Sequence, residues 1–190
     1  MKITQEFTVD RPVSDVWAFF ADVPEVARCL PGAELTADHG DGDYEGRLEA
    51  KLGPMTVSFE GKASVTRDEE DRTGHIQGSG ADRRGGSRGR VKVDYAVVGD
   101  ADATTVTVDA DITLSGPAAQ FGRVGLIKEM SSRLIVDFVD CLEAKLEAET
   151  AEEAEAIESA EVGGFTLFFS SLWAQITKFF GRLFGRSTEL

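Results

Sequence analysis

Cysteine, histidine and long apolar runs are scarce in this chain of 190 residues, and each scarcity argues against certain classes of protein. The only two cysteines, Cys29 and Cys141, are far apart, so nothing indicates a disulfide scaffold. We interpret them as small buried hydrophobic residues of a protein in a reducing cytoplasm. The two histidines, His39 and His75, have no second ligand at metal spacing, so no metal site is expected.

Signals for secretion, nucleotide binding and nucleic-acid binding are also missing. The N-terminal stretch MKITQEFTVDRPVSD has no apolar core of the kind that a secretory signal requires. No P-loop, CxxC or serine-elbow pattern occurs, and GSGADR at 78–83 lacks the third glycine of a dinucleotide fingerprint. A net charge of −14 argues against nucleic-acid binding, which needs a basic surface.

The charge is unevenly distributed, and the distribution divides the chain into three parts. Residues 1–148 have the patterning of a folded domain, and 149–162 (ETAEEAEAIESAEV) contain six glutamates and no base. We predict a solvated linker or an exposed helical extension there. Residues 163–190 carry three basic residues and one acid, together with six of the twelve phenylalanines, so a separate tail is expected.

Strict alternation of apolar and polar residues predicts an antiparallel sheet that is covered on one face. The alternation extends over residues 44–52, 55–65, 91–97 and 106–114, and residues 3–9 and 75–82 indicate two further strands. Helical patterns occupy residues 10–32 and a long stretch from Pro117 to about Glu147. These elements predict an α+β helix-grip fold, a curved antiparallel sheet wrapped around a long C-terminal helix, followed by an amphipathic tail helix.

The inner strand faces are apolar, and several of their residues are small. No His, Asp, Glu, Lys or Cys points inward from the four main strands, and Tyr44 and Tyr95 are the only polar-tipped residues. Acid–base or nucleophilic catalysis therefore has no suitable group, and a non-catalytic role is expected. Small residues such as Gly46 and Ala63 indicate either an apolar ligand cavity or close packing and strand coiling.

We expect such a cavity to be lined by residues from the sheet and from the helices. They are Trp17, Phe20, Leu48, Met55, Val57, Phe59, Val93, Tyr95, Val108, Ile112, Phe121, Val124, Ile127, Leu134 and Phe138. Outside this set, Arg83, Arg84, Arg88, Arg90 and Lys92 form a basic cluster. That cluster is either merely solvated or in contact with headgroups or a partner.

The tail has the pattern of an amphipathic helix. Its charge-free run, 162–177, is shorter than the ~20 residues that a membrane span requires. The apolar stripe and basic flanks favour an interfacial helix on a membrane surface, while docking into a partner's groove or onto the domain itself are the alternatives. The residues predicted to bind the membrane are Phe165, Phe168, Phe169, Leu172, Trp173, Ile176, Phe179, Phe180, Lys178 and Arg182.

Three segments carry a resemblance to a known family: PVSDVWAFFADVPEVARCLPGAE, LGPMTVSFEGKASV and LSGPAAQFGRVGLIKEMSSRLIVDFVDCLEAKL. Over roughly residues 1–148 the chain resembles the CoxG family of carbon monoxide dehydrogenase subunits, within the Bet v 1/START-like (SRPBCC) superfamily. Compared with that family, the segment from Arg83 to Lys92 is longer and more basic.

The resemblance implies a non-catalytic accessory of an aerobic carbon monoxide dehydrogenase or a related molybdenum hydroxylase. It also implies a carried isoprenoid quinone such as menaquinone, with no covalently bound cofactor. The expected location is the cytoplasm, peripherally attached to the inner face of the cell membrane. The alternatives are a tether without ligand, a polyketide-cyclase-like enzyme and a lipid-transfer protein of the same superfamily.

Overall fold

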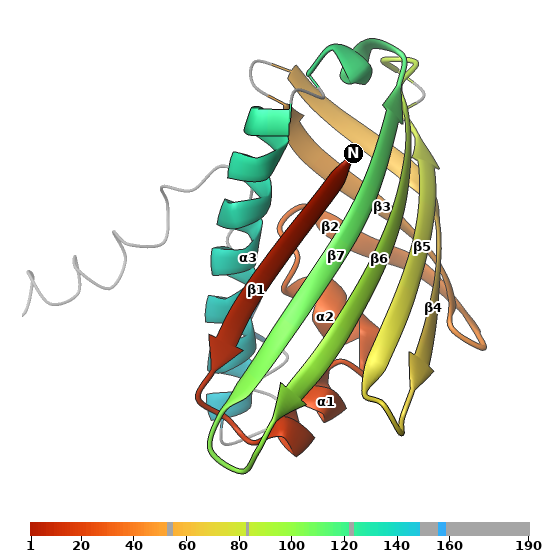
Figure 1. Cartoon of the computed structure of the whole chain (residues 1–190). Helices are drawn as coiled ribbons and strands as arrows, with labels where there is room; N and C mark the ends of the chain where they lie inside the picture. Colours follow the sequence, from red (N-terminus) through yellow and green to blue (C-terminus); the bar gives the residue numbers. More distant parts are fainter. Residues whose placement is uncertain (53–54, 83, 122–123, 149–155, 159–190) are drawn as a thin grey trace, which may run out of the picture.

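The computed structural model describes residues 1–52, 55–82, 84–121, 124–148 and 156–158. The elements of this part of the chain follow one another in a simple order (Figure 1). They are β1 (Lys2–Val9), α1 (Val13–Phe19), α2 (Val23–Arg28), β2 (Ala33–Gly40), β3 (Asp43–Leu52), β4 (Met55–Asp68), β5 (Thr73–Ala81), β6 (Arg88–Gly99), β7 (Thr104–Ser115), the 3-10 helix η1 (Pro117–Phe121) and α3 (Val124–Glu147).

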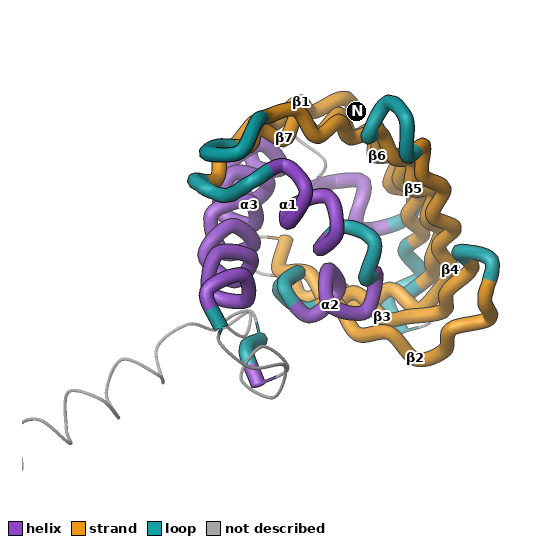
Figure 2. Tube along the Cα trace, turned by 90° about the horizontal axis from the view of Figure 1, so that it is seen from below, coloured by secondary structure: helices purple, strands orange, loops and turns teal. Residues whose placement is uncertain are grey.

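The strands form a single antiparallel sheet in the order β1-β7-β6-β5-β4-β3-β2. Strands β2 to β7 follow one another as neighbours, and β1 returns to pair with β7. The sheet curls, and α3 lies across the opening between its two edges, so that the sheet and α3 form a ring around α1 and α2 (Figure 2). The predicted helix-grip fold is thus confirmed. We call the end that holds α1 and α2 the lower end and the end that holds η1 the upper end (Figure 1).

One strand was not predicted, and the start of one helix differs from the prediction. The alternation did not predict β2, whose inward positions are occupied by the small Ala33 and by Leu35, beside a polar second half, TADHG. The long helix begins at Val124 rather than at Pro117, because a separate 3-10 turn comes first. That turn is held by the buried Ser87, whose hydroxyl accepts a hydrogen bond from the Ala118 amide at 3.0 Å.

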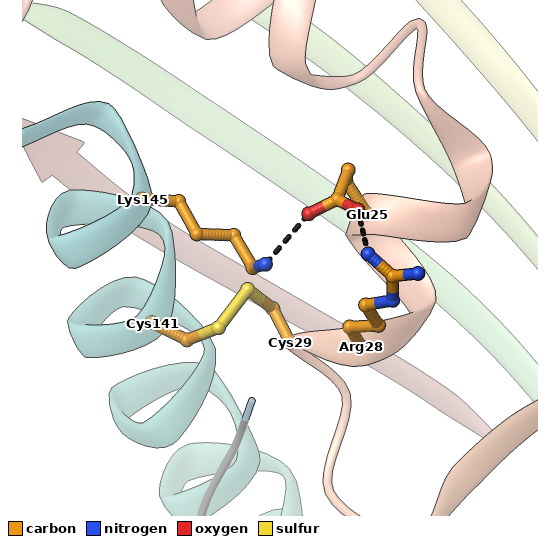
Figure 3. Close-up of a disulfide and its surroundings, with 5 residues drawn as sticks. All are labelled: Glu25, Arg28, Cys29, Cys141 and Lys145. Atoms are coloured by element: carbon orange, nitrogen blue, oxygen red, sulfur yellow. Dashed lines mark hydrogen bonds and ion pairs between the residues drawn. A yellow bond between two sulfur atoms is a disulfide. The ribbon is translucent and has the colours of Figure 1, made fainter. Parts of the chain in front are cut away.

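The two cysteines are joined, which contradicts their interpretation as free buried thiols. Cys29, just after α2, and Cys141, in α3, form a disulfide that links residues 112 positions apart, with Cα atoms 5.4 Å from each other (Figure 3). Both residues are almost fully buried. The two patterns were correctly assigned to helices, but only the packing of α2 against α3 brings the sulfur atoms together. The argument from cysteine content for a reducing compartment therefore no longer holds.

An ion pair reinforces the same contact between α2 and α3. The Lys145 Nζ of α3 donates to Glu25 Oε2 at 2.6 Å, and Glu25 also pairs with Arg28 of its own helix (Figure 3). The Lys145 side chain is only 2% exposed. A buried ammonium needs such a partner, because removal from water otherwise disfavours its charge. Nearby, Arg11 pairs with Glu147 at 2.7 Å, so several contacts fix the C-terminal end of α3.

The turn between β6 and β7 provides a prediction about pH. The Asp100 carboxylate accepts hydrogen bonds from the amides of Asp102 at 2.9 Å and Ala103 at 3.1 Å, and these bonds lower its pKa. A lowered native pKa contributes stability that is present above the unfolded value and lost as pH falls through the native one. Asp100→Asn retains an acceptor but does not titrate. In denaturant titrations, the advantage of the wild type over this variant should be constant at neutral pH and shrink in acid below the usual aspartate pKa. An advantage that persists undiminished in acid would contradict this account.

Candidate functional site

The buried side chains form two separate clusters at opposite ends of the ring. The lower cluster contains buried residues of α1, β6 and α3, with Val16, Trp17, Tyr95 and Leu142 among them. The upper cluster is smaller and consists of the buried Ile3, Val57 and Ala118, with partly buried neighbours. Ile157 packs against the lower cluster, so this part of the predicted linker is not fully solvated.

Between the clusters lies a set of inward-facing apolar residues that belong to neither, which we call the inner belt. Its members share the inner face of the sheet, as the strand register requires, and none is fully buried. Leu48 is the extreme case, since it is 43% exposed although it shares a face with Phe59 of the upper cluster. The inner belt comprises Leu48, Ala63, Val65, Val91, Val93 and Ala110. This surface is therefore available to an apolar molecule.

Aromatic rings form the floor of the inner belt. Phe20 stacks on Tyr95 with ring centroids 5.1 Å apart, and Phe138 of α3 lies 6.0 Å from Phe20. Trp17 lies 6.4 Å from Tyr95 on the other side. Stacked and edge-on rings at these distances stabilise one another beyond their area burial. Closely packed aromatic rings thus close the lower end of the inner belt.

A charged side chain, Arg67, reaches this floor and was missed by the sequence analysis. The alternation was followed only as far as Val65, but β4 continues to Asp68, and Arg67 falls on the inner face. Its guanidinium lies 3.9 Å from the centre of the Trp17 ring, and Nη2 donates to the Trp17 carbonyl at 3.1 Å. Trp17 Nε1 in turn donates to Glu69 Oε2 at 2.6 Å. Following the alternation for one more step along the strand would have found Arg67.

The inward tyrosines differ in their surroundings. Burial raises the pKa of Tyr95, Arg67 acts in the opposite direction and Glu69 raises it further, so the hydroxyl remains protonated at neutral pH. The Tyr95 ring lies directly over Gly74, where a Cβ would come 2.1 Å from the ring. Burial also raises the pKa of Tyr44, and the negative charges of Asp38 and Asp22 raise it further.

The small residues of the inner face serve the curvature of the sheet. Gly46, Gly61, Gly80 and Gly89 lie side by side across β3 to β6. A Cβ on Gly61 would lie 1.9 Å from the Ser79 carbonyl oxygen, because the strands bend sharply towards each other there. Strand coiling, the alternative reading of these residues, thus explains this glycine. The case for a ligand rests on the partly exposed apolar side chains of the inner belt rather than on the glycines.

The structure distributes the predicted lining residues over three regions. Trp17, Phe20, Tyr95 and Phe138 are buried in the lower cluster with Val108 packed against it, and Val57, Phe59 and Ile112 belong to the upper cluster. Leu48 and Val93 lie in the inner belt, and Leu134 of α3 is partly buried. The side chains of Met55, Phe121, Val124 and Ile127 lie outside the described part of the structure, as does the whole predicted tail from Phe165 to Arg182. No helix within the described ranges is long and apolar enough to cross a membrane.

The remaining candidates lie on the outer face. The basic cluster is at the turn between β5 and β6 and along β6, where the exposed Arg88, Arg90 and Lys92 all point outward. Arg83 lies outside the described residues. His75 lies 2.6 Å from Asp94, and His39 lies 3.3 Å from Glu45, which also pairs with Lys62. Within the described ranges, no group of three or more His, Cys, Asp or Glu residues could hold a metal ion.

Comparison with solved structures places this geometry in a known fold. A conserved protein from Geobacillus kaustophilus superposes with a TM-score of 0.67 and 15% identity, over 77% of this chain and 95% of the other. The Zhui aromatase/cyclase from Streptomyces sp. R1128 gives 0.55 and 16%, over 77% and 93%. Norcoclaurine synthase from Thalictrum flavum gives 0.50 and 19%, over 78% and 95%. At these identities the likeness concerns the fold alone.

Comparison of sequences adds one family. Residues 6–147 match the family model of the carbon monoxide dehydrogenase subunits known as CoxG. The match spans almost all of the described domain, from β1 to the last residue of α3. None of the curated protein sequences matches the chain.

Proposed function

Because this chain belongs to the CoxG family of carbon monoxide dehydrogenase subunits, we propose that it is a non-catalytic accessory protein that carries a hydrophobic ligand for that enzyme system. The ligand class is an isoprenoid quinone such as menaquinone, and the partner is the dehydrogenase or a related molybdenum hydroxylase. The inner belt is the observation that carries the proposal, since its apolar side chains face inward and remain at least partly exposed. In this role the interior receives the ligand and the outer face of the domain meets the enzyme.

The energetics of such a carrier are favourable without a catalytic group. Burying ~300 Å² of apolar ligand at about 25 cal/mol per Å² gives a gross gain of about 7 kcal/mol. The loss of ligand freedom on binding reduces this gain, which leaves an affinity suited to loading and release. A carrier needs this balance, because a ligand bound too tightly is not delivered. A ligand that buries a moderate apolar area is therefore suited to transport, because the protein can release it.

The tail supplies the membrane linkage in this proposal. Its aromatic stripe and its basic residues, Lys178 and Arg182, are suited to the headgroup region of a bilayer. On this basis we propose that the protein is attached peripherally to the cell membrane.

Extraction of the purified protein tests the carrier function. Organic extraction and mass spectrometry of the full chain should recover an isoprenoid quinone in a reproducible ratio to protein. Val93→Trp should reduce this amount severalfold, because the larger side chain occupies the inner belt. Lys92→Trp is the matched control, since Lys92 is the adjacent residue on the outer face and its replacement should leave the amount unchanged. A reproducibly empty wild-type protein would leave only a tethering role.

A further inference from the structure

The floor of the inner belt holds two hydrogen-bond donors that have no acceptor among the described residues. Arg67 Nε is fully buried and has no hydrogen-bond partner within the described chain. The Tyr95 residue is only 5% exposed, and its hydroxyl makes no hydrogen bond to the described residues. A buried donor without an acceptor destabilises the fold, because it has lost its hydrogen bonds to water. A native structure that retains such a group needs an explanation, and a functional role is one of them.

The strand register places these two side chains at the same location. Arg67 is the cross-strand partner of Gly74, and Gly74 is the partner of Tyr95. Because Gly74 has no side chain, the Tyr95 ring extends across β5 towards Arg67, and its hydroxyl oxygen is 2.3 Å from the position that a Cβ on Gly74 would take. Gly74 is thus required for the hydroxyl to lie beside the guanidinium.

The Tyr95 hydroxyl is not fully enclosed by the described residues. Among the described residues, Arg67 Nε is the one fully buried side-chain atom that lacks a partner. The Tyr95 hydroxyl also has no hydrogen-bond partner among the described residues, but it is not fully buried. A small polar group can therefore contact it. The Arg67 guanidinium is held in place by three contacts: Nη2 donates to the Trp17 carbonyl and lies 3.4 Å from Glu69 Oε1, and the guanidinium lies over the Trp17 ring.

We propose that Tyr95, with Arg67 beside it, forms the polar anchor for a ligand that presents a carbonyl oxygen. The inference rests on the proposed carrier function and specifies the chemistry of its ligand. The Tyr95 hydroxyl donates to the carbonyl oxygen, and the positive charge of Arg67 favours the partial negative charge of that oxygen. A planar quinone ring then lies on the aromatic floor near Trp17, and the isoprenoid chain extends along the inner belt towards the upper end.

Tyr95→Phe separates this role from a purely structural one. Because the hydroxyl makes no bond within the described protein, its removal should leave the thermal midpoint unchanged or raise it. The same change should weaken binding of menaquinone-4 about three- to tenfold, the worth of one hydrogen bond. The carbonyl-free probe 2-methyl-3-geranylgeranylnaphthalene should bind the wild type and the variant equally well. Tyr44→Phe, which removes the other inward hydroxyl, is the matched control and should change neither affinity.

Trp17 fluorescence reports where the ring lies. The full chain has two tryptophans, so Trp173→Phe leaves Trp17 as the only emitter. Menaquinone-4 should quench Trp17 in this background and the naphthalene probe should quench it less, because the quinone ring accepts electrons from the excited indole. Gly74→Ala, which retains the hydroxyl but displaces the ring that carries it, should weaken menaquinone-4 binding as Tyr95→Phe does.

Three results would overturn the anchor. Equal menaquinone-4 affinity in wild type and Tyr95→Phe would mean that water alone meets these donors. Equal losses for both probes would mean that Tyr95 acts through shape rather than through its hydroxyl. A wild type that binds neither probe would overturn the carrier function itself, and the anchor with it.

Discussion

Simultaneous replacement of Cys29 and Cys141 by alanine should lower the free energy of unfolding by about 4–5 kcal/mol. The disulfide closes a loop with a sequence separation of 112 residues, and cross-links across long loops restrict the unfolded chain most. Both residues are almost fully buried. Because alanine is apolar, the replacement leaves no unsatisfied polar group in the core. Guanidinium titration followed by circular dichroism measures the loss.

The same titration under reducing conditions supplies the control. A dithiol should destabilise the wild-type protein by a similar amount and leave the double alanine variant unaffected. The denaturant dependence should become steeper without the cross-link, because the freed unfolded chain exposes more surface. If the two proteins were equally stable under oxidising conditions, the disulfide would not contribute to the fold.

Substitution of Phe168, Trp173 and Phe180 by aspartate should release the protein from membranes. Each aromatic side chain contributes about 1.5–3 kcal/mol when it is buried. Loss of all three therefore exceeds about 4 kcal/mol, roughly a thousandfold in the partition constant. Co-sedimentation with vesicles of phosphatidylcholine and phosphatidylglycerol should find the wild type in the pellet and the variant in the supernatant.

A matched variant distinguishes lost apolar contact from altered charge. Ser170, Ser171 and Ala174 lie on the opposite side of the same helical pattern. Their replacement by aspartate adds the same charge but should retain most of the binding, because the aromatic stripe is intact. Equal release of both variants would mean that charge alone attracts the tail. Equal pelleting of the wild type and the Phe168, Trp173 and Phe180 variant would remove the anchor.

The sequence predicted the fold well because most strands have one apolar face. Strands β3, β4, β6 and β7 alternate over most of their length, and each was found from that period alone. Strand β2 escaped because its second half is polar. The start of α3 was placed too early because Pro117 is compatible with the first turn of either a 3-10 helix or an α-helix.

The candidate site was less accessible to sequence reasoning. The apolar inner face followed from periodicity, but the division into two clusters with an exposed belt between them depends on how far the sheet curls. The disulfide escaped because Cys29 and Cys141 meet only when α2 packs on α3. Arg67 was not predicted as an inward residue, because a charged residue near the end of an alternating pattern usually indicates that the strand has ended. Each of these features depends on tertiary packing, which a local pattern does not encode.

The ties between α3 and its surroundings also determine the shape of the candidate site. Cys141, Lys145 and Glu147 hold the final turns of α3 to α2 and to the loop after β1. Phe138 lies about one turn before Cys141 on the same helix, and its ring belongs to the aromatic floor. The disulfide therefore fixes the position of this ring as well as the contact between the two helices.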